Sequence, residues 1–261
     1  MWIGTLLGGL NRYDGSKFVV YKPELKEGSI SSSVIFTIYE DSRNRLWIGT
    51  DGGGLNLYNR DSDNFTSFRH DSGNPYSISS DQVYAILEDR NGNIWVGTDG
   101  GGLNIMREDG TFIPFDPSSD GSEPLKNDII RVLYQDSKNR LLVGTEGRGL
   151  TVIDYGMEGA ELYTNNPDDP HSIQSDTIRS IFEDSRGHIW LGLENRGICE
   201  FLPEKNIFRP LPLPGDNPGR KLSVRAITED NDGRLWIGTD NDGIYIFSPD
   251  KIGRASCRER V

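Results

Sequence analysis

Residues 91–103 have the sequence Asn-Gly-Asn-Ile-Trp-Val-Gly-Thr-Asp-Gly-Gly-Gly-Leu and form one copy of a unit that recurs along the chain. The unit consists of an apolar segment with Trp, a Gly-Thr exit, an acidic Gly-rich turn and a second apolar segment. Its first glycine recurs as Gly4, Gly49, Gly97, Gly144, Gly192 and Gly238. The spacing of about 47 residues is typical of repeat architectures.

Each complete repeat contains four short apolar segments separated by turn residues, as in residues 34–40, 46–50, 55–59 and 64–69. Four short strands per repeat of this length predict an all-β protein, a β-propeller of four-stranded antiparallel blades. We expect one propeller domain over residues 1–250, truncated at both ends. Its predicted parts are a partial blade at 1–21, blades at about 34–69, 82–116, 128–165 and 176–209, and a partial blade at 222–250.

The recurring Trp residues have a structural explanation in this fold. Each blade has two apolar faces and buries them against its neighbours, so the same slot between blades recurs with the repeat. We therefore interpret Trp47, Trp95, Trp190 and Trp236 as core residues rather than as ligand-stacking residues. Cys199 lies on a predicted strand and is expected to be a small buried residue.

Composition and charge exclude several classes of protein. The chain has 261 residues and a formal net charge of −12, whereas binding to nucleic acid requires a surplus of Lys and Arg. The same charge argues against contact with an anionic membrane surface. No apolar run approaches the roughly 18 residues that span a membrane, and two cysteines give no disulfide framework. We expect no cofactor.

Both ends of the chain interrupt the repeat. Met1 occupies a position inside a repeat, so the lack of a signal peptide does not indicate where the parent protein is located. Residues 251–261 break the pattern abruptly and are strongly basic. They resemble a translated sequencing adapter, residue for residue. We therefore interpret them, Cys257 included, as non-native.

Several copies of the repeat resemble one known family. Residues 34–56, 83–104 and 224–243 are similar to the two-component regulator propeller repeat, with Val-x-x-Ile-x-Glu-Asp, a turn, Trp-Ile-Gly-Thr and Gly-Gly-Leu-Asn. The links at 74–80 and 169–173 resemble the family's Asn-Pro-x-Ser-Leu-Ser link. The resemblance extends over residues 1–250.

The resemblance implies the periplasmic sensor region of a hybrid two-component histidine kinase. Such regions combine two propellers and a β-sandwich ahead of a membrane helix and a kinase, and many sense oligosaccharides. The implied partners are an oligosaccharide ligand, the second propeller and β-sandwich of the parent chain, and a second copy in a homodimer. No nucleic acid and no direct membrane contact are expected.

Candidate ligand-binding residues lie in the turns between second and third strands and in the links between blades, which share a rim in this fold. The turns begin with an acid, which either shapes the turn or hydrogen-bonds sugar hydroxyls. Two turns also replace Gly with Arg, whose planar fork suits an acidic sugar, although an ion pair with the neighbouring Glu also explains it. The links add an aromatic ring or His, either of which is an exposed link residue or stacks on a sugar. The candidates are Arg148, Arg196, Glu146, Glu194, Asp99, Tyr76 and His171.

Other chemistry finds no support in the sequence. The acidic turns at 89–93 and 230–233 resemble the start of a calcium loop but depart from its later positions, so we predict hairpin turns and no metal. No catalytic constellation appears, and we expect no enzyme activity in this chain. Two alternatives to a ligand-binding sensor remain open: a scaffold or dimerisation propeller, and a polysaccharide-active enzyme on the same fold.

Overall fold

The computed structural model describes residues 1–115, 125, 128–154, 159–213 and 221–248. The predicted adapter segment, 251–261, lies outside the described residues. Within these ranges the regular structure is β-strand, apart from one short 3-10 helix, η1 (Pro203–Lys205). No helix there is long and apolar enough to cross a membrane.

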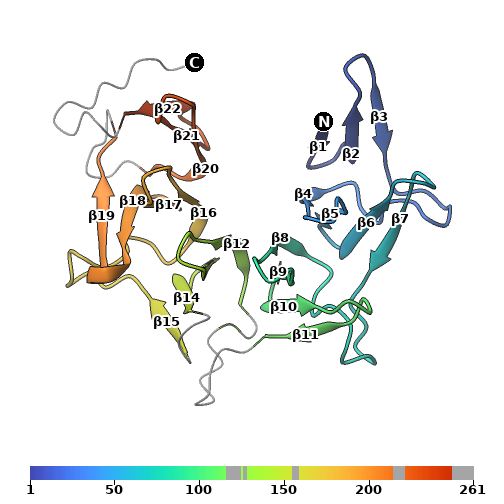
Figure 1. Ribbon diagram of the computed structural model, residues 1–261, viewed down its shortest axis with the longest axis horizontal. Helices are drawn as coiled ribbons and strands as arrows, with labels where there is room; N and C mark the ends of the chain where they lie inside the picture. Colours follow the sequence, from blue (N-terminus) through green and yellow to red (C-terminus); the bar gives the residue numbers. More distant parts are fainter. Residues whose placement is uncertain (116–124, 126–127, 155–158, 214–220, 249–261) are drawn as a thin grey trace. The chain divides into compact units, whose positions relative to one another are not determined.

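The strands form six antiparallel sheets in which neighbours in sequence are neighbours in the sheet (Figure 1). The sheets are β1 (Trp2–Gly4), β2 (Leu10–Tyr13) and β3 (Phe18–Tyr21); β4 (Ile35–Glu40), β5 (Leu46–Thr50), β6 (Leu55–Asn59) and β7 (Asn64–Phe68); β8 (Val83–Glu88), β9 (Ile94–Thr98), β10 (Leu103–Met106) and β11 (Phe112–Pro114); β12 (Ile130–Gln135), β13 (Arg140–Thr145), β14 (Leu150–Asp154) and β15 (Ala160–Tyr163); β16 (Ile178–Glu183), β17 (Ile189–Leu193), β18 (Gly197–Leu202) and β19 (Ile207–Leu211); and β20 (Val224–Glu229), β21 (Leu235–Thr239) and β22 (Ile244–Phe247). The predicted fold class, a β-propeller of four-stranded antiparallel blades, is confirmed.

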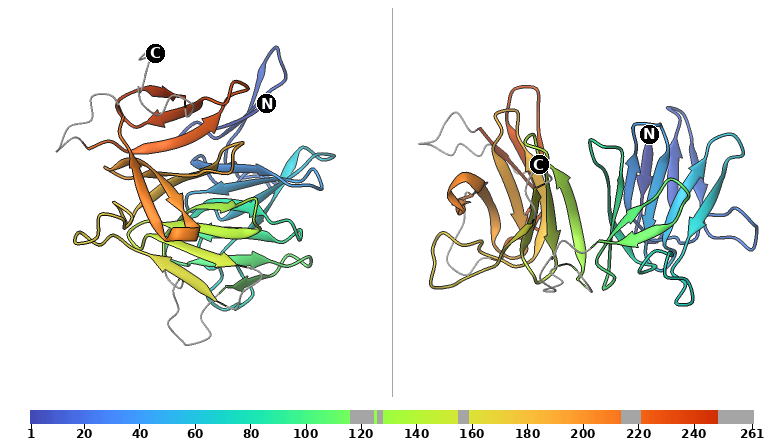
Figure 2. Two further views of the ribbon diagram at one scale, coloured as in Figure 1. Left: turned by 60° about the vertical axis from the view of Figure 1, so that its left-hand side comes forward. Right: turned by 60° about the horizontal axis from the view of Figure 1, so that its bottom comes forward.

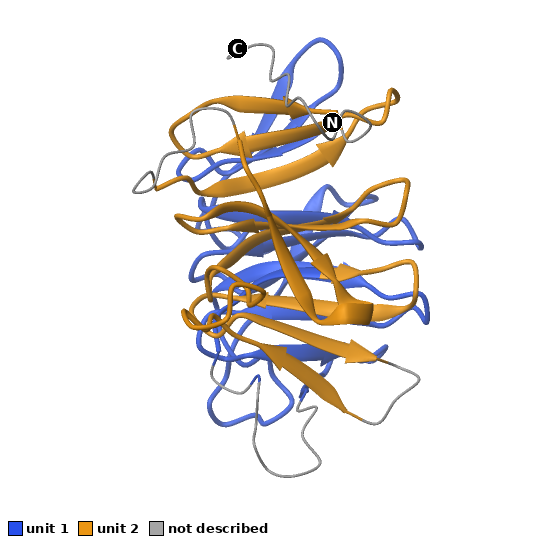
Figure 3. Cartoon of the chain, turned by 90° about the vertical axis from the view of Figure 1, so that its left-hand side faces the viewer, with its two compact units in different colours: residues 1–133 blue, residues 134–261 orange. Residues whose placement is uncertain are grey.

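The chain divides into two compact units, residues 1–133 and 134–261 (Figure 3). Unit 1 contains the sheets β1–β3, β4–β7 and β8–β11, and unit 2 contains β13–β22. Within unit 2, the sheet β20–β22 packs against the sheet β16–β19 through β20, β16 and β17 (Figure 2). Within unit 1, β8 packs in the same way against β4 and β5. The first two strands of one blade therefore cover the face of the next.

The repeat's first glycine marks the place where the next blade crosses, as at Gly49 and Gly192. A Cβ added at Gly49 would lie 2.8 Å from Val83 Cγ1 on β8, and one at Gly192 would lie 2.8 Å from Val224 Cγ1 on β20. The following threonine closes the turn, since Thr50 Oγ1 donates to the carbonyl of Gly54 at 2.8 Å. The repeat's period is thus a packing requirement between blades as well as a turn signal.

Trp47, Trp95 and Trp190 are core residues, as predicted, whereas Trp236 is only partly buried. Trp47 and Trp95 are fully buried, and Trp190 is nearly so. Trp47 packs among residues of its own blade and of the next, including Val83 and Phe112. Cys199 is likewise buried, as expected, and burial raises the pKa of its thiol.

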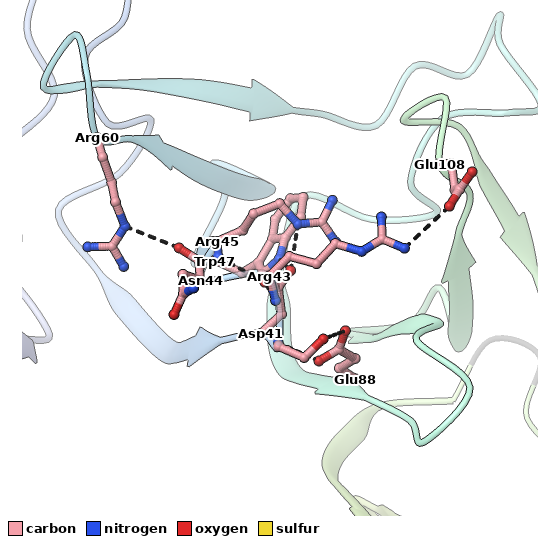
Figure 4. Close-up of polar contacts among 9 residues, drawn as sticks. Asp41, Arg43, Asn44, Arg45, Trp47, Arg60, Glu88 and Glu108 are labelled. Carbon is pink, nitrogen blue, oxygen red and sulfur yellow. Dashed lines mark hydrogen bonds and ion pairs between the residues drawn. The ribbon is translucent and has the colours of Figure 1, made fainter.

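In four blades an aspartate after the first strand holds the turn and the Trp together, and in three of these it is buried (Figure 4). Asp41 Oδ1 accepts bonds from the amides of Arg43 and Arg45, at 3.0 and 2.8 Å. Its Oδ2 accepts from Arg45 Nε at 2.6 Å and from Trp47 Nε1 at 2.8 Å. The same Trp bond recurs at Asp89, Asp184 and Asp230. This carboxylate–indole bond explains why Asp and Trp recur six residues apart.

The turns at 89–93 and 230–233, which we weighed as calcium loops, are hairpin turns of this kind. Each joins two paired strands, β8 to β9 and β20 to β21. Their first aspartates are occupied by turn amides and by the Trp indole. Among the described residues, no group of His, Cys, Asp and Glu side chains is arranged to hold a metal ion.

The turn of one blade is also tied to the first strand of the next. Ser42 donates from its amide to Glu88 Oε2 at 2.6 Å and from its hydroxyl to Oε1 at 2.8 Å (Figure 4). Ser185 is bound in the same way by Glu229, at 2.8 and 2.9 Å. The Glu-Asp pairs at 88–89, 183–184 and 229–230 therefore have two roles. The Glu grips the preceding blade, and the Asp builds its own turn.

Acidification is expected to destabilise the chain between about pH 4 and pH 2. Burial alone would raise the pKa of Asp184, but bonds from Trp190 and His188 outweigh it and hold the pKa below the ordinary 3.8. The bond from Trp236 is the largest cause that lowers the pKa of Asp230, to about 2. Because the unfolded chain binds these protons more readily, the stabilisation is complete above about pH 4 and is lost as the pH falls.

Urea midpoints measured from about pH 6 down to pH 2.5 test this expectation. The wild-type midpoint should fall steeply below about pH 4. Asp184→Asn, which retains the side-chain shape but has no carboxyl to titrate, should start lower and fall less steeply. A wild-type midpoint that stays constant over this range would contradict the expectation.

Candidate functional site

The turns between second and third strands share a rim with the links between blades, as predicted. The amide of Asp51 donates to the carbonyl of Val34 at 3.1 Å, and Gly54 donates to the carbonyl of Asp81 in the next link at 2.7 Å. The turns at 51–54, 99–102 and 194–197 are each held in this way between the link before the blade and the link after it. Side chains from three sequence-distant segments can meet at this rim.

In the first two complete blades, a small polar cluster closes the turn against the link. Ser31 donates to the carbonyl of Gly53 at 2.7 Å and accepts from Asn56 Nδ2 at 2.7 Å. Ser79, Gly101 and Asn104 repeat the arrangement, at 2.6 Å for both bonds. We call this set the Ser–Asn clasp. A Cβ at Gly53 would lie 2.4 Å from Ser31 Oγ, so the clasp leaves no room for a side chain at the glycine.

The two Arg substitutions occur where the clasp is lost. Arg196 replaces the glycine of the clasp, Gln174 replaces its serine and Cys199 replaces its asparagine. In the preceding blade, Arg148 stands with Thr151, and the corresponding link residue, Lys126, lies outside the described residues. Neither Thr151 Oγ1 nor Gln174 Oε1, both buried, has a hydrogen-bond partner in the described chain. The two Arg residues thus occur together with changes at other positions of the clasp.

A groove replaces the clasp at Arg196. Its volume is about 310 Å³, and it is lined by Arg196, Gln174 and the link residues Asn165, Asn166, Pro167, Asp169, Pro170 and Ser172. We call it the link groove. Arg196 is exposed, and its guanidinium contacts no carboxylate among the residues that the structure describes. The structure therefore brings Arg196 together with the link.

The two turn glutamates do not pair as considered from the sequence. Instead of an Arg of their own turns, both accept from Arg179 on β16: Nε lies 2.7 Å from Glu194 Oε2 and Nη1 lies 3.3 Å from Glu146 Oε2. The Arg179 side chain is only 14% exposed. It therefore ties two consecutive blades of unit 2 together at the rim.

Arg179 belongs to a column that the sequence interpretation missed. The second residue of each first strand is Phe36, Tyr84, Arg131, Arg179 or Arg225. Arg225 binds Asp240, with Nη2 at 2.9 Å from Oδ2, and this donation is the largest cause that raises the pKa of Arg225. A signal was available in the sequence, since three Arg in one repeat column depart from the apolar pattern of a strand.

In unit 1, Asp99 contacts a residue at this same repeat position, the second residue of a first strand. Tyr84 donates from its hydroxyl to Asp99 Oδ2 at 3.1 Å. The Tyr84 ring lies 4.5 Å from that of Phe36, and the Arg131 guanidinium lies 3.8 Å from the Tyr84 centroid. Asp99 is thus a turn acid with a partner on a first strand, as Glu194 and Asp240 are.

Tyr76 and His171 occupy corresponding places in two links, as predicted. The carbonyl of Tyr76 accepts from the amide of Phe112, and that of His171 accepts from Phe208, both at 2.8 Å. Both side chains are exposed, and Tyr76 is 56% exposed. Neither residue lines the link groove, which His171 flanks through Pro170 and Ser172. Tyr76 belongs to unit 1, whereas Arg148 and Arg196 belong to unit 2.

Comparison with protein families gives one match. The model of the two component regulator propeller matches residues 29–52, 77–100, 172–195 and 219–241. Each matched segment contains a first strand, its aspartate turn and a second strand. None of the curated proteins matches the chain.

Solved structures with similar folds come from several kinds of protein. The extracellular domain of a protein described as a hybrid two-component system, from B. thetaiotaomicron, is 22% identical, with a TM-score of 0.80 over 100% of this chain and 33% of its own. A second such domain from that organism, described as a one-component system, is 20% identical, with a TM-score of 0.54 over 95% of this chain and 38% of its own. The chain thus spans about a third of these domains.

An enzyme is also among the similar structures. Virginiamycin B lyase from Staphylococcus aureus is 13% identical, with a TM-score of 0.69 over 94% of this chain and 76% of its own. At this level of identity the similarity concerns the fold alone, and one fold can carry unrelated functions.

Proposed function

Because the chain belongs to the two-component regulator propeller family, we propose that it is part of the periplasmic sensor region of a two-component signalling protein and binds an oligosaccharide. Similarity in fold to extracellular domains of such systems supports the location. The proposed parent chain adds a second propeller and a β-sandwich, and acts as a homodimer. We propose no catalytic activity for this chain.

The observation that carries the ligand proposal is the link groove. Two blades close this rim with the Ser–Asn clasp, and the blade of Arg196 leaves it open. The groove combines an exposed guanidinium with side-chain amides and a carboxylate, which are groups that hydrogen-bond sugar hydroxyls and carboxylates. An oligosaccharide containing a uronic acid matches this set, with its carboxylate on Arg196.

Many polar side-chain atoms of the link already form hydrogen bonds within the link. Asn165 Nδ2 donates to the carbonyl of Ile173 at 2.7 Å, and Asp169 Oδ1 accepts from the amide of His171 at 2.9 Å. These bonds fix the groove wall before a ligand arrives, which lowers the entropic cost of binding. Arg196 and the exposed faces of the link are therefore the proposed recognition groups.

The double variant Arg196→Gly with Gln174→Ser is expected to weaken binding strongly. It restores two residues of the clasp and removes the guanidinium, so affinity for a uronic-acid disaccharide should fall at least about tenfold. The measurement is calorimetric titration, supported by thermal shift. A ligand at about 100 times its Kd stabilises the folded state by roughly 2.7 kcal/mol. Matched neutral disaccharides should bind more weakly.

Arg43→Gln is the control, because Arg43 is an exposed arginine in another turn, where it pairs with Glu108 at 3.3 Å. It should leave the affinity unchanged. Binding that survives the double variant would remove the link groove from the proposal. If no member of a broad oligosaccharide panel shifts the melting temperature, the scaffold alternative is favoured. Turnover of a glycan would favour the enzyme alternative.

A further inference from the structure

One complete blade lacks the tryptophan that fills its neighbours' cores. The tryptophan of a blade lies on the second strand, two residues after the turn arginine or its equivalent. This residue is Trp47, Trp95, Trp190 or Trp236 in four blades, but it is Leu142 in the sheet β12–β15. Asp136 of that blade is buried like the other turn aspartates and accepts from Arg140 Nε at 2.7 Å. Asp136 accepts the equivalents of the hydrogen bonds that Asp41 accepts, except for the bond from an indole.

The Trp47 slot shows what normally surrounds the indole. Leu57, Phe68 and Met106 pack against the buried group that contains Trp47. The ring of Phe68 lies 6.1 Å from that of Trp47, and the guanidinium of Arg45 lies 5.1 Å from the indole centroid. The slot is therefore walled by apolar and aromatic groups and capped by a cation.

Strand register identifies the equivalent residues around Leu142. Leu142 pairs with Val152 as Trp47 pairs with Leu57, and Leu150 pairs with Tyr163 as Leu55 pairs with Phe68. On the next blade, Phe201 pairs with Phe208 as Met106 pairs with Phe112. Val152, Tyr163 and Phe201 thus correspond to the three walls of the Trp47 slot.

These three residues line a pocket of about 530 Å³ within unit 2, together with Arg140, the equivalent of Arg45. Its lining also includes Lys138, Ala160, Glu161, Glu204 and Asn206. We call it the slot pocket. Leu142 itself does not line the pocket, but by strand register an indole at its position would be directed among Val152, Tyr163 and Phe201, which do.

We propose that the slot pocket is a binding site for a planar aromatic ring of about the size of indole. The rings of Tyr163 and Phe201 meet at 66° with centroids 5.2 Å apart, which gives the ligand an aromatic wall. Arg140 is 13% exposed, and Asp136 holds it as Asp41 holds Arg45. It is thus positioned to lie over a bound ring, where a guanidinium attracts the π face.

The mouth of the slot pocket is polar and is set for substituents on such a ring. Lys138 and Glu204 form an ion pair across the two blades, and Tyr163 donates to Glu161 and lies 3.0 Å from Asn206 Oδ1. The volume falls in the range of small-molecule sites. This site is separate from the link groove, and its ligand differs in kind from the proposed oligosaccharide.

Indole and indole-3-propionate are suitable probes, titrated against the full chain by calorimetry. Leu142→Trp should fill the slot pocket with the chain's own indole and weaken probe binding at least tenfold. It should also raise the melting temperature, because Asp41 shows that one carboxylate accepts both an arginine and an indole. Leu142→Met, which is close to leucine in volume, is the matched control and should bind like wild type.

Three results would overturn the proposal: no probe binding by wild type, equal binding by Leu142→Trp, or displacement of the probe only by saccharides. If Leu142→Trp does not fold, methyl spectra of the wild type decide. Probe-induced shifts centred on Val152 and Ala160, the two methyl-bearing residues among those that line the pocket, support the site, and shifts confined to distant methyl groups contradict it. Because the link-groove variant leaves this pocket intact, failure of one proposal does not imply failure of the other.

Discussion

Asp41→Ala is expected to lower the free energy of unfolding by about 3 kcal/mol. The Asp41 side chain is fully buried, and it is the acceptor for the Trp47 indole and for two turn amides. Removal of the carboxylate leaves the indole N–H buried without an acceptor, which costs about 1–3 kcal/mol, and also releases the turn amides and Arg45. Urea unfolding at neutral pH, followed by Trp fluorescence, measures the loss.

Asp14→Ala provides the matched control. Asp14 Oδ1 also accepts two turn amides, from Ser16 and Lys17, but Asp14 is exposed and has no indole partner. Its removal should cost less than about 1 kcal/mol, because water can replace the lost bonds. Equal losses for the two variants would refute the view that the buried indole bond dominates.

Gly49→Ala is expected to destabilise the chain by about 3 kcal/mol, although alanine is compatible with a strand. The added Cβ would lie 2.6 Å from Thr37 Cγ2 and 2.7 Å from the carbonyl oxygen of Val83. The second contact is with backbone of the next blade, which cannot rotate away as a side chain can. The two blades must therefore separate, and the buried apolar contacts between them weaken. Thermal and urea unfolding report this loss.

Gly52→Ala separates crowding from backbone strain. Gly52 has a φ of +69°, and a Cβ there would meet nothing within 4 Å. Its replacement should cost only the left-handed conformation of an alanine, about 1 kcal/mol. Should Gly52→Ala prove as damaging as Gly49→Ala, the recurring glycine would be explained by turn geometry rather than by blade packing.

Much of the fold was predictable from local pattern. Alternating apolar residues predict strands, and Gly and Asp predict turns, because strands and turns each depend on a few successive residues. The strand over residues 46–50 and its neighbour over 55–59 were predicted with the bounds that the structure has. The burial of Trp47 followed from its recurrence alone. Its bond to Asp41 was not predicted, because a local pattern does not show which side chain accepts from a buried indole.

The candidate site was predictable only in outline. The sequence indicated Arg196 because it departs from the repeat, and the shared rim because of strand order. The alternative in which Glu194 forms an ion pair with the Arg of its own turn was wrong. Glu194 instead pairs with Arg179, which lies 15 residues away on the first strand of the blade. Such a partner depends on which side chains of adjacent strands share a face at the rim.

The sequence by itself determined the period, the strand order, the turns and the columns that are buried, because these follow from hairpin geometry repeated about every 47 residues. Only the tertiary structure decided that Arg179 binds two turn acids, that a groove lies where the Ser–Asn clasp is lost, and that a pocket lies between Val152, Tyr163 and Phe201. Each of these depends on how one blade packs on the next. The contacting residues are brought together by the register of strands that are far apart in sequence, and no local pattern specifies the space left between them.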